Sequence, residues 1–199
     1  MTDHQRLREA LAQLRPEDSL EATVAHWHDT PAKKGGFELT PCSYAVAILI
    51  NRRVEWIIWG AGYSPEAIPP VVFGIKALLQ VVPPCRRLEV HALKALDDAI
   101  CHDGYGRYAM DHGGKTRTSG KPLGCYPAIA DIINAYDSHR WFFIPYRHMV
   151  EASGYSEAEE MAKGQAKTAA LKHKAEFAPT TADYPKPTIL QEFAHAYSG

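Results

Sequence analysis

The chain has 199 residues, a formal net charge of −1, a hydrophobic fraction of 46% and a charged fraction of 23%. This composition is typical of a globular domain and excludes a fibrous protein, a wholly disordered chain and a disulfide-bonded miniprotein. The near-neutral charge argues against a bulk electrostatic coat for DNA, but it is compatible with a local basic groove.

The hydrophobic pattern predicts secondary-structure elements in a definite order. Strands are expected at residues 22–28, 44–50, 54–59, 88–91 and 141–144. Helices are expected at residues 3–14, 71–82, 93–100, 126–137 and 156–172, and residues 103–124 read as a Gly-rich loop or a poorly marked helix with a loop. A hairpin meander followed by alternating helices and strands predicts an α/β fold. Its mixed sheet has three antiparallel strands, then parallel additions, with helices on both faces.

Three parts of the chain are expected from this pattern. Residues 1–19 form an N-terminal helical extension, and residues 20–172 form the α/β domain. Residues 173–199 form a Pro-containing tail, in which residues 189–197 could form a short amphipathic helix. The N-terminal helix and the tail are the segments that could dock a protein partner.

Cysteine spacing and hydropathy indicate the cellular compartment. The four cysteines form no C-x-x-C pair, so a zinc ribbon has no support and reduced thiols are the simplest interpretation. The N-terminus is polar and lacks the apolar core of a signal peptide. The longest apolar run is far shorter than the roughly 20 residues that a membrane helix needs. We therefore expect a cytoplasmic protein without a membrane partner.

Carboxylates at three places are suited to metal-assisted chemistry. Asp29 follows the first strand, where a side chain is held rigidly and reaches solvent, although Asp-Thr-Pro is also a common turn. Glu66 precedes the apolar helix, where the helix dipole alone would favour an acid. Glu159 belongs to a capping box with Ser156, which leaves the neighbouring Glu160 available.

Three histidines could also carry chemistry. His148 lies in a polar loop after the fifth strand, where a histidine is usually only solvated. His26 and His28 alternate along the first strand, so their imidazoles could share a zinc ion in a hydrolase site. Two strand histidines without a ligand role are the more common case.

Basic residues cluster in two loops. Residues 107–121 carry Arg107, Lys115, Arg117 and Lys121, with Tyr105, Tyr108 and His112 among them. Cations for phosphates and rings for stacking are what nucleic-acid contact uses, although a solvated flexible loop would have a similar composition. Lys33 and Lys34 lie in the glycine loop after the first strand.

The element order and these residues resemble the ribonuclease H family over residues 20–172. The hairpin that runs into an apolar helix (residues 44–78) is similar to that family's hairpin. Lys121-Pro122, the helix 126–137, the strand 141–146 and His148 follow at family-like spacing. The acid-bearing helix near Glu159 also follows at family-like spacing. The resemblance implies a ribonuclease-H-like five-stranded mixed sheet.

Enzymes of that family cut the RNA strand of RNA/DNA hybrids. They use four carboxylates, in the order Asp, Glu, Asp, Asp, to hold two Mg²⁺ ions. Carried over by position, the first Asp falls on Asp29, the Glu on Glu66 and the last Asp on Glu159 or Glu160. The family's mobile histidine falls on His148. The resemblance implies nucleic-acid binding, a metal site for Mg²⁺ or Mn²⁺, and hydrolysis of phosphodiester bonds.

This sequence departs from the family pattern at the third carboxylate. The corresponding place reads Val90-His91-Ala92-Leu93, and Asp97 and Asp98 lie too far along the next helix. An imidazole ligand from His91 would favour Mn²⁺ over Mg²⁺. Two interpretations follow: a metal-dependent nuclease with an altered site, or a catalytically inactive ribonuclease-H-like module that binds nucleic acid or a protein partner.

Overall fold

A computed structural model describes residues 3–28, 40–64, 71–83, 87–92, 99–100, 103–123, 126–138, 141–145, 155–176 and 188–190. The helices are α1 (Asp3–Ala12), α2 (Val71–Val81), α4 (Tyr105–Asp111), α5 (Tyr126–Ser138) and α6 (Tyr155–Glu176). The strands are β1 (Leu20–His28), β2 (Thr40–Ile50), β3 (Arg53–Ser64), β4 (Leu88–Ala92), β5 (Trp141–Pro145) and β6 (Thr188–Leu190). None of the described helices is long and apolar enough to cross a membrane.

The strands form one mixed sheet in the order β5-β4-β1-β2-β3-β6. β1, β2 and β3 are an antiparallel meander, whereas β4 pairs parallel with β1 and β5 pairs parallel with β4. The tight turn between β2 and β3 places Asn51 and Arg52 at positive φ, 51° and 66°, which is the backbone that a two-residue hairpin requires. The Asn51 side chain then accepts a hydrogen bond from the Ser19 amide at 2.9 Å, which fixes the start of β1 against this hairpin.

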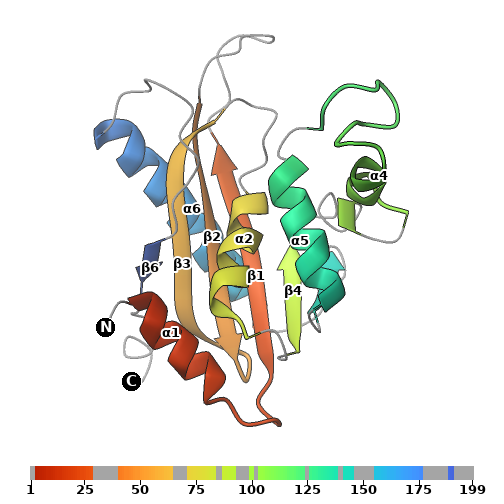
Figure 1. Cartoon of the computed structure of the whole chain (residues 1–199). Coiled ribbons are helices and arrows are strands. Elements are labelled where there is room, and N and C mark those ends of the chain that lie inside the picture. Colours follow the sequence, from red (N-terminus) through yellow and green to blue (C-terminus); the bar gives the residue numbers. More distant parts are fainter. Residues whose placement is uncertain are drawn as a thin grey trace, which may run out of the picture.

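Helices cover both faces of the sheet (Figure 1). α2 and α5 cover one face and α1 packs against α2. This side holds the larger core, which includes Leu7, Val24, Val46 and Ile75. α6 crosses the other face over β1, β2 and β3.

The contact beneath α6 is built from small side chains. Ala158, Ala162 and Ala166 recur every four residues and pack on alanines of β1 and β2, so the helix axis can approach the sheet closely. The buried Ser43 hydroxyl donates a hydrogen bond to the Ala166 carbonyl. These contacts fix the position of α6 along the strands β1 and β2.

This architecture confirms the predicted fold class, with one addition. The tail contributes a sixth strand, β6, which pairs antiparallel with β3 at Ile57, Ile58 and Trp59. The short helix predicted for residues 189–197 is therefore wrong at its start, and residues 191–197 lie outside the described part. The physical reason is that the edge strand β3 offers unsatisfied backbone groups, which a β-branched segment can pair with. Within residues 103–124, α4 is the helix that was poorly marked in the sequence.

The packing of α2 on the sheet leaves no room for a side chain at Gly74. A Cβ at Gly74 would lie 2.9 Å from the Cγ1 atom of Val24 and 3.3 Å from the Cγ2 atom of Val46. Both valines are fully buried in central strands, and their branched side chains have little rotamer freedom. The close approach of α2 to the sheet therefore depends on glycine at this position.

We predict that Gly74→Ala lowers the free energy of unfolding by up to about 2 kcal/mol. The substitution gains about 1 kcal/mol of helix propensity, but overpacking a filled core costs about 1–3 kcal/mol. Urea denaturation measures the difference. Gly164→Ala in α6 is the matched control, because the added methyl group meets no atom of the described residues within 4 Å beyond its own stretch of helix; it should stabilise the protein. Equal stabilisation by both substitutions would contradict the close packing.

Candidate functional site

The predicted site begins at the carboxyl end of β1. β1 ends at His28, so Asp29 is the next residue along the chain. Asp29 itself lies outside the described residues, as do several others of the predicted site: Lys33, Lys34, Glu66 and His148. Their roles stay predictions.

Glu159 and Glu160 lie near the start of α6, and both contact one lysine. The Lys163 Nζ atom is 2.6 Å from a Glu159 carboxylate oxygen and 3.4 Å from one of Glu160. The hydrogen bond to Glu159 is the main reason that the pKa of Lys163 is raised. A metal ion binding to either carboxylate would compete with this ammonium group. Neither glutamate belongs to a group of three metal-ligating side chains among the described residues.

His26 and His28 lie side by side on one face of β1. Their rings stack with centroids 5.9 Å apart and planes 7° from parallel. Burial, with a smaller contribution from the charge of His28, lowers the pKa of His26, so this imidazole is predominantly neutral near pH 7. In the described part of the chain, no third ligand completes a zinc site with this pair.

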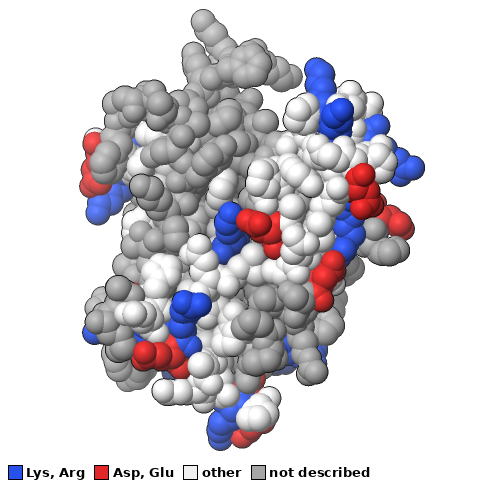
Figure 2. Space-filling view, in the orientation of Figure 1, with Lys and Arg blue, Asp and Glu red and all other residues white. Residues whose placement is uncertain are grey.

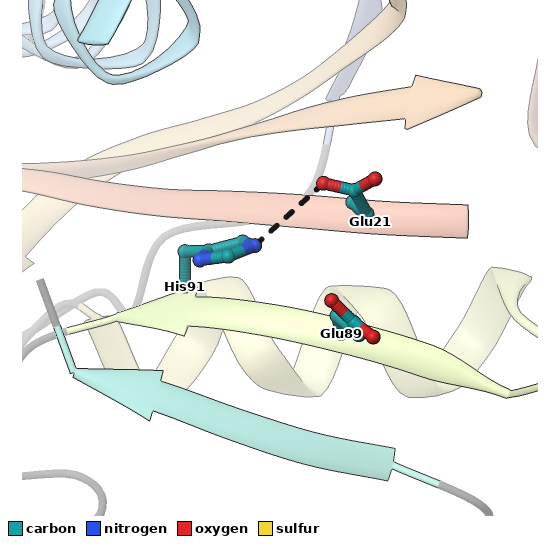
Figure 3. A group of neighbouring side chains, drawn as sticks. All are labelled: Glu21, Glu89 and His91. Carbon is teal, nitrogen blue, oxygen red and sulfur yellow. Dashed lines mark ion pairs between the residues drawn. The ribbon is translucent and has the colours of Figure 1, made fainter. Parts of the chain in front are cut away.

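Glu21, Glu89 and His91 form a compact group where β1 and β4 pair (Figure 3). Glu21 is the register partner of Glu89, and Thr23 is the partner of His91. Alternate strand residues share a face, so these four side chains lie on the face that α6 covers. One ligand atom from each of Glu21, Glu89 and His91 lies within 4.8 Å of the other two. Among the described residues, this is the one group of three His, Cys, Asp or Glu side chains with such spacing.

Burial and charge differ across this group. Glu21 is 3% exposed and His91 is 2% exposed, and their nearest oxygen and nitrogen are 3.8 Å apart. Glu89 is partly exposed and accepts a hydrogen bond from the Arg87 guanidinium at 3.0 Å. Chemically, the group combines buried carboxylate and imidazole, the ligand types of divalent transition metals.

Sequence analysis identified His91 alone and missed Glu21 and Glu89. It treated His91 as a substitute for a third carboxylate, whereas the structure places it beside two glutamates that the family pattern does not include. A signal was present in the sequence. The segments Leu-Glu-Ala-Thr-Val and Leu-Glu-Val-His-Ala put polar side chains at alternate positions of two strands, and parallel pairing buries such strands on both faces.

A second polar feature is the hairpin-like loop after α4, residues 112–123, which an isolated bridge between Lys115 and Pro122 closes. Lys115, Arg117 and Lys121 are exposed on it. The space-filling view shows basic side chains projecting over this region at the upper right, with acidic side chains below them (Figure 2).

Aromatic rings accompany this loop. The rings of Tyr108 and His112 stack at 3.8 Å and 9°, and the Arg117 guanidinium lies 5.7 Å from the centre of the Tyr108 ring. This contact is a cation–π pair of the kind that proteins also use to stack on bases.

Arg107, the fourth basic residue predicted to bind nucleic acid, is held within the protein. Its guanidinium donates to both carboxylate oxygens of Asp137 on α5, at 2.9 Å and 2.6 Å. Its Nε donates to the Ile100 carbonyl at 2.7 Å. Arg107 is therefore the least accessible of the four, and it anchors α4 to α5.

Comparisons with known proteins bear on the fold. No protein-family model and no curated protein sequence matches the chain. Among solved structures, the chain is similar to native prototype foamy virus protease–reverse transcriptase, with 10% identity and a TM-score of 0.50. That match covers 81% of this chain but 22% of the viral protein.

Two further structures match less closely. The foamy viral protease–reverse transcriptase in complex with an RNA/DNA hybrid gives 11% identity and a TM-score of 0.46, over 78% of this chain and 20% of that one. LC9-RNase H1, a type 1 RNase H with the type 2 active-site motif, gives 12% identity and a TM-score of 0.48, over 80% and 75%. The strand order described above, together with the first of these matches at a TM-score of 0.50, identifies a ribonuclease-H-like fold.

We predict that Asp137→Asn destabilises the protein by less than about 1 kcal/mol at neutral pH, because solvent screens this partly exposed pair. Hydrogen bonds from Arg107 hold the pKa of Asp137 below its ordinary value, which is about 3.9 in an unfolded chain. The pair therefore stabilises the fold above about pH 4 and is lost as pH falls through the folded-state pKa. Urea denaturation of the unaltered chain and of Asp137→Asn at neutral and acidic pH measures this effect. The difference between their free energies of unfolding should shrink in acid.

Asp131→Asn on the same helix is the control. Asp131 contacts one exposed lysine, Lys76, at 2.8 Å, and lacks the two parallel hydrogen bonds of the Arg107 pair. Its substitution should have the smaller effect. If both variants lose the same stability at every pH, the anchoring role of Arg107 is wrong.

Proposed function

We propose that the chain is a nucleic-acid-binding, ribonuclease-H-like protein that hydrolyses the RNA strand of RNA/DNA hybrids with a divalent metal ion. The observation that carries the proposal is the strand arrangement. β1 lies between an antiparallel partner and a parallel one, and its carboxyl end leads directly into Asp29. In open α/β sheets, ligands bind at the carboxyl ends of the strands where the chain connections diverge.

The chemistry requires oxygen ligands from several elements at this edge. In the proposed site, Asp29 is a metal ligand, with Glu66 and Glu159 or Glu160 completing the oxygen set, and His148 handles a proton or the product. The metal, Mg²⁺ or Mn²⁺, would position the attacking water and neutralise charge on the phosphate. A carboxylate of α6 can take part only if it exchanges its contact with Lys163 for the metal.

Nucleic-acid binding is proposed for the loop after α4. Lys115, Arg117 and Lys121 are exposed there beside stacked rings, a combination suited to a phosphate backbone and unpaired bases. Lys33 and Lys34 are proposed to extend this contact from the loop after β1. A hybrid or another structured nucleic acid is the expected partner.

A second function, a catalytically inactive module, is favoured by two observations. Both late glutamates contact Lys163, and the place of a third carboxylate is taken by His91, which lies with Glu21 and Glu89. Loss of one carboxylate from a site built on charge costs orders of magnitude in rate. Such a module would retain binding to nucleic acid or to a protein partner without turnover.

Cleavage of labelled substrates distinguishes the two functions. RNA/DNA hybrid, RNA and DNA are incubated with the protein in Mg²⁺ or Mn²⁺. The nuclease proposal predicts metal-dependent cleavage of the hybrid that Asp29→Asn reduces by about 10²-fold or more. Asp131→Asn, a surface substitution on α5, should leave the rate unchanged. Binding of the hybrid without cleavage in either metal would support the inactive module instead.

We predict that replacing Lys115, Arg117 and Lys121 together by alanine weakens hybrid binding and reduces its salt dependence. Each lost phosphate contact lowers the slope of log affinity against log salt by about 0.7–0.9, so the slope should fall by about 2 or more. Fluorescence anisotropy over a range of salt concentrations measures both quantities.

The matched control replaces three exposed lysines of α6, Lys167, Lys172 and Lys174, by alanine. This variant has the same change in net charge, so it tests whether position or total charge matters. An identical slope in both triple variants would rule out a specific role for the loop after α4.

A further inference from the structure

We propose that Glu21, Glu89 and His91 bind one divalent transition-metal ion where β1 and β4 pair, near the amino-terminal end of β1. The ion class is Zn²⁺, Mn²⁺ or Co²⁺, for which one imidazole and two carboxylates are suitable ligands. Glu21 precedes His28 by seven strand residues, which is roughly 23 Å at 3.3 Å per residue. Glu21 is therefore far from the carboxyl end of β1, where Asp29 follows, and the metal proposal does not depend on nuclease activity.

The spacing of the ligand atoms suits a shared ion. The Oε2 atom of Glu21 and the Nε2 atom of His91 are 3.8 Å apart, which is longer than a hydrogen bond. Two atoms that each lie roughly 2.0–2.2 Å from one metal are separated by roughly 3–4 Å at ordinary coordination angles. Glu89 contributes the third ligand atom within the 4.8 Å group.

A buried hydroxyl beside the group is the second observation that points to a ligand. Thr23 is fully buried, and its Oγ1 atom has no hydrogen-bond partner among the described residues. It lies on the same face as Glu21, at the register position of His91. A water molecule on the metal ion would supply the partner that this hydroxyl lacks, since buried polar atoms are rarely left unsatisfied.

A cavity gives the ion a route from solvent. It has a volume of about 750 Å³ and is lined by Glu21 and Glu89, by Leu11 of α1, by Leu14 after that helix, and by Arg52. Three protein ligands and an opening to a cavity leave a coordination position for water or a small anion. Arg87, which also lines the cavity, contacts Glu89 at 3.0 Å, so metal binding has to share or displace this guanidinium.

The test uses the full chain after removal of metal with a chelator. Titration with Co²⁺ should produce visible absorption that saturates at one equivalent, and Zn²⁺ should compete for it and raise the melting temperature. Glu89→Gln, at a partly exposed position, should weaken Co²⁺ affinity at least tenfold. His112→Gln, which removes an exposed imidazole, should bind as the unaltered chain does.

A measurement on the unaltered chain keeps the result independent of how the variants fold. Zn²⁺ should shift the imidazole nitrogen resonances of His91 and leave those of His112 in place. Absence of Co²⁺ absorption, or equal affinity in the unaltered chain and Glu89→Gln, would overturn the proposal and leave Glu21 and His91 as a buried acid–imidazole pair. Because no nucleic acid is present, failure here is separable from failure of the hydrolase proposal.

Discussion

The parallel pairing of β1 with β4 is the interaction on which the rest of the structure depends. It converts a simple antiparallel meander into a mixed sheet and gives the chain connections a point of divergence. β1 is then flanked by strands on both edges and covered by helices on both faces, so its first six residues are all buried. Any polar side chain within that stretch must find its partners inside the protein.

The two ends of β1 have different chemical surroundings. Near the amino-terminal end, Glu21 and the neighbouring His91 are buried, and a cavity lined in part by Leu11 of α1 reaches Glu21. At the carboxyl end, the exposure of β1 rises through Trp27 to His28, which is where a large polymeric substrate could approach. A site for a small ion and a site for nucleic acid can thus occupy one strand without overlapping.

Most of the fold could be predicted because its signals are local. Periodicity located the meander, α2, α5 and α6, and the order of elements gave the sheet topology. β6 could not be predicted in this way, because three residues carry little local signal and their conformation is set by the open edge of β3. The candidate metal group was also missed, because Glu21 and His91 are seventy residues apart and only the register brings them together. Arg107 shows the same limit: its partner Asp137 lies on another helix, so the sequence could not distinguish an internal anchor from a surface cation.

The strand β6 has a consequence for how the protein behaves among other chains. An uncovered outer strand is a template for intermolecular pairing and growth of aggregates, and β3 would present such a margin at Ile57, Ile58 and Trp59. β6, which pairs with this edge of β3, lies within the last twelve residues of the chain. Solubility at high concentration therefore depends on this short segment, because its removal by a protease would open the edge of β3 to pairing with other chains.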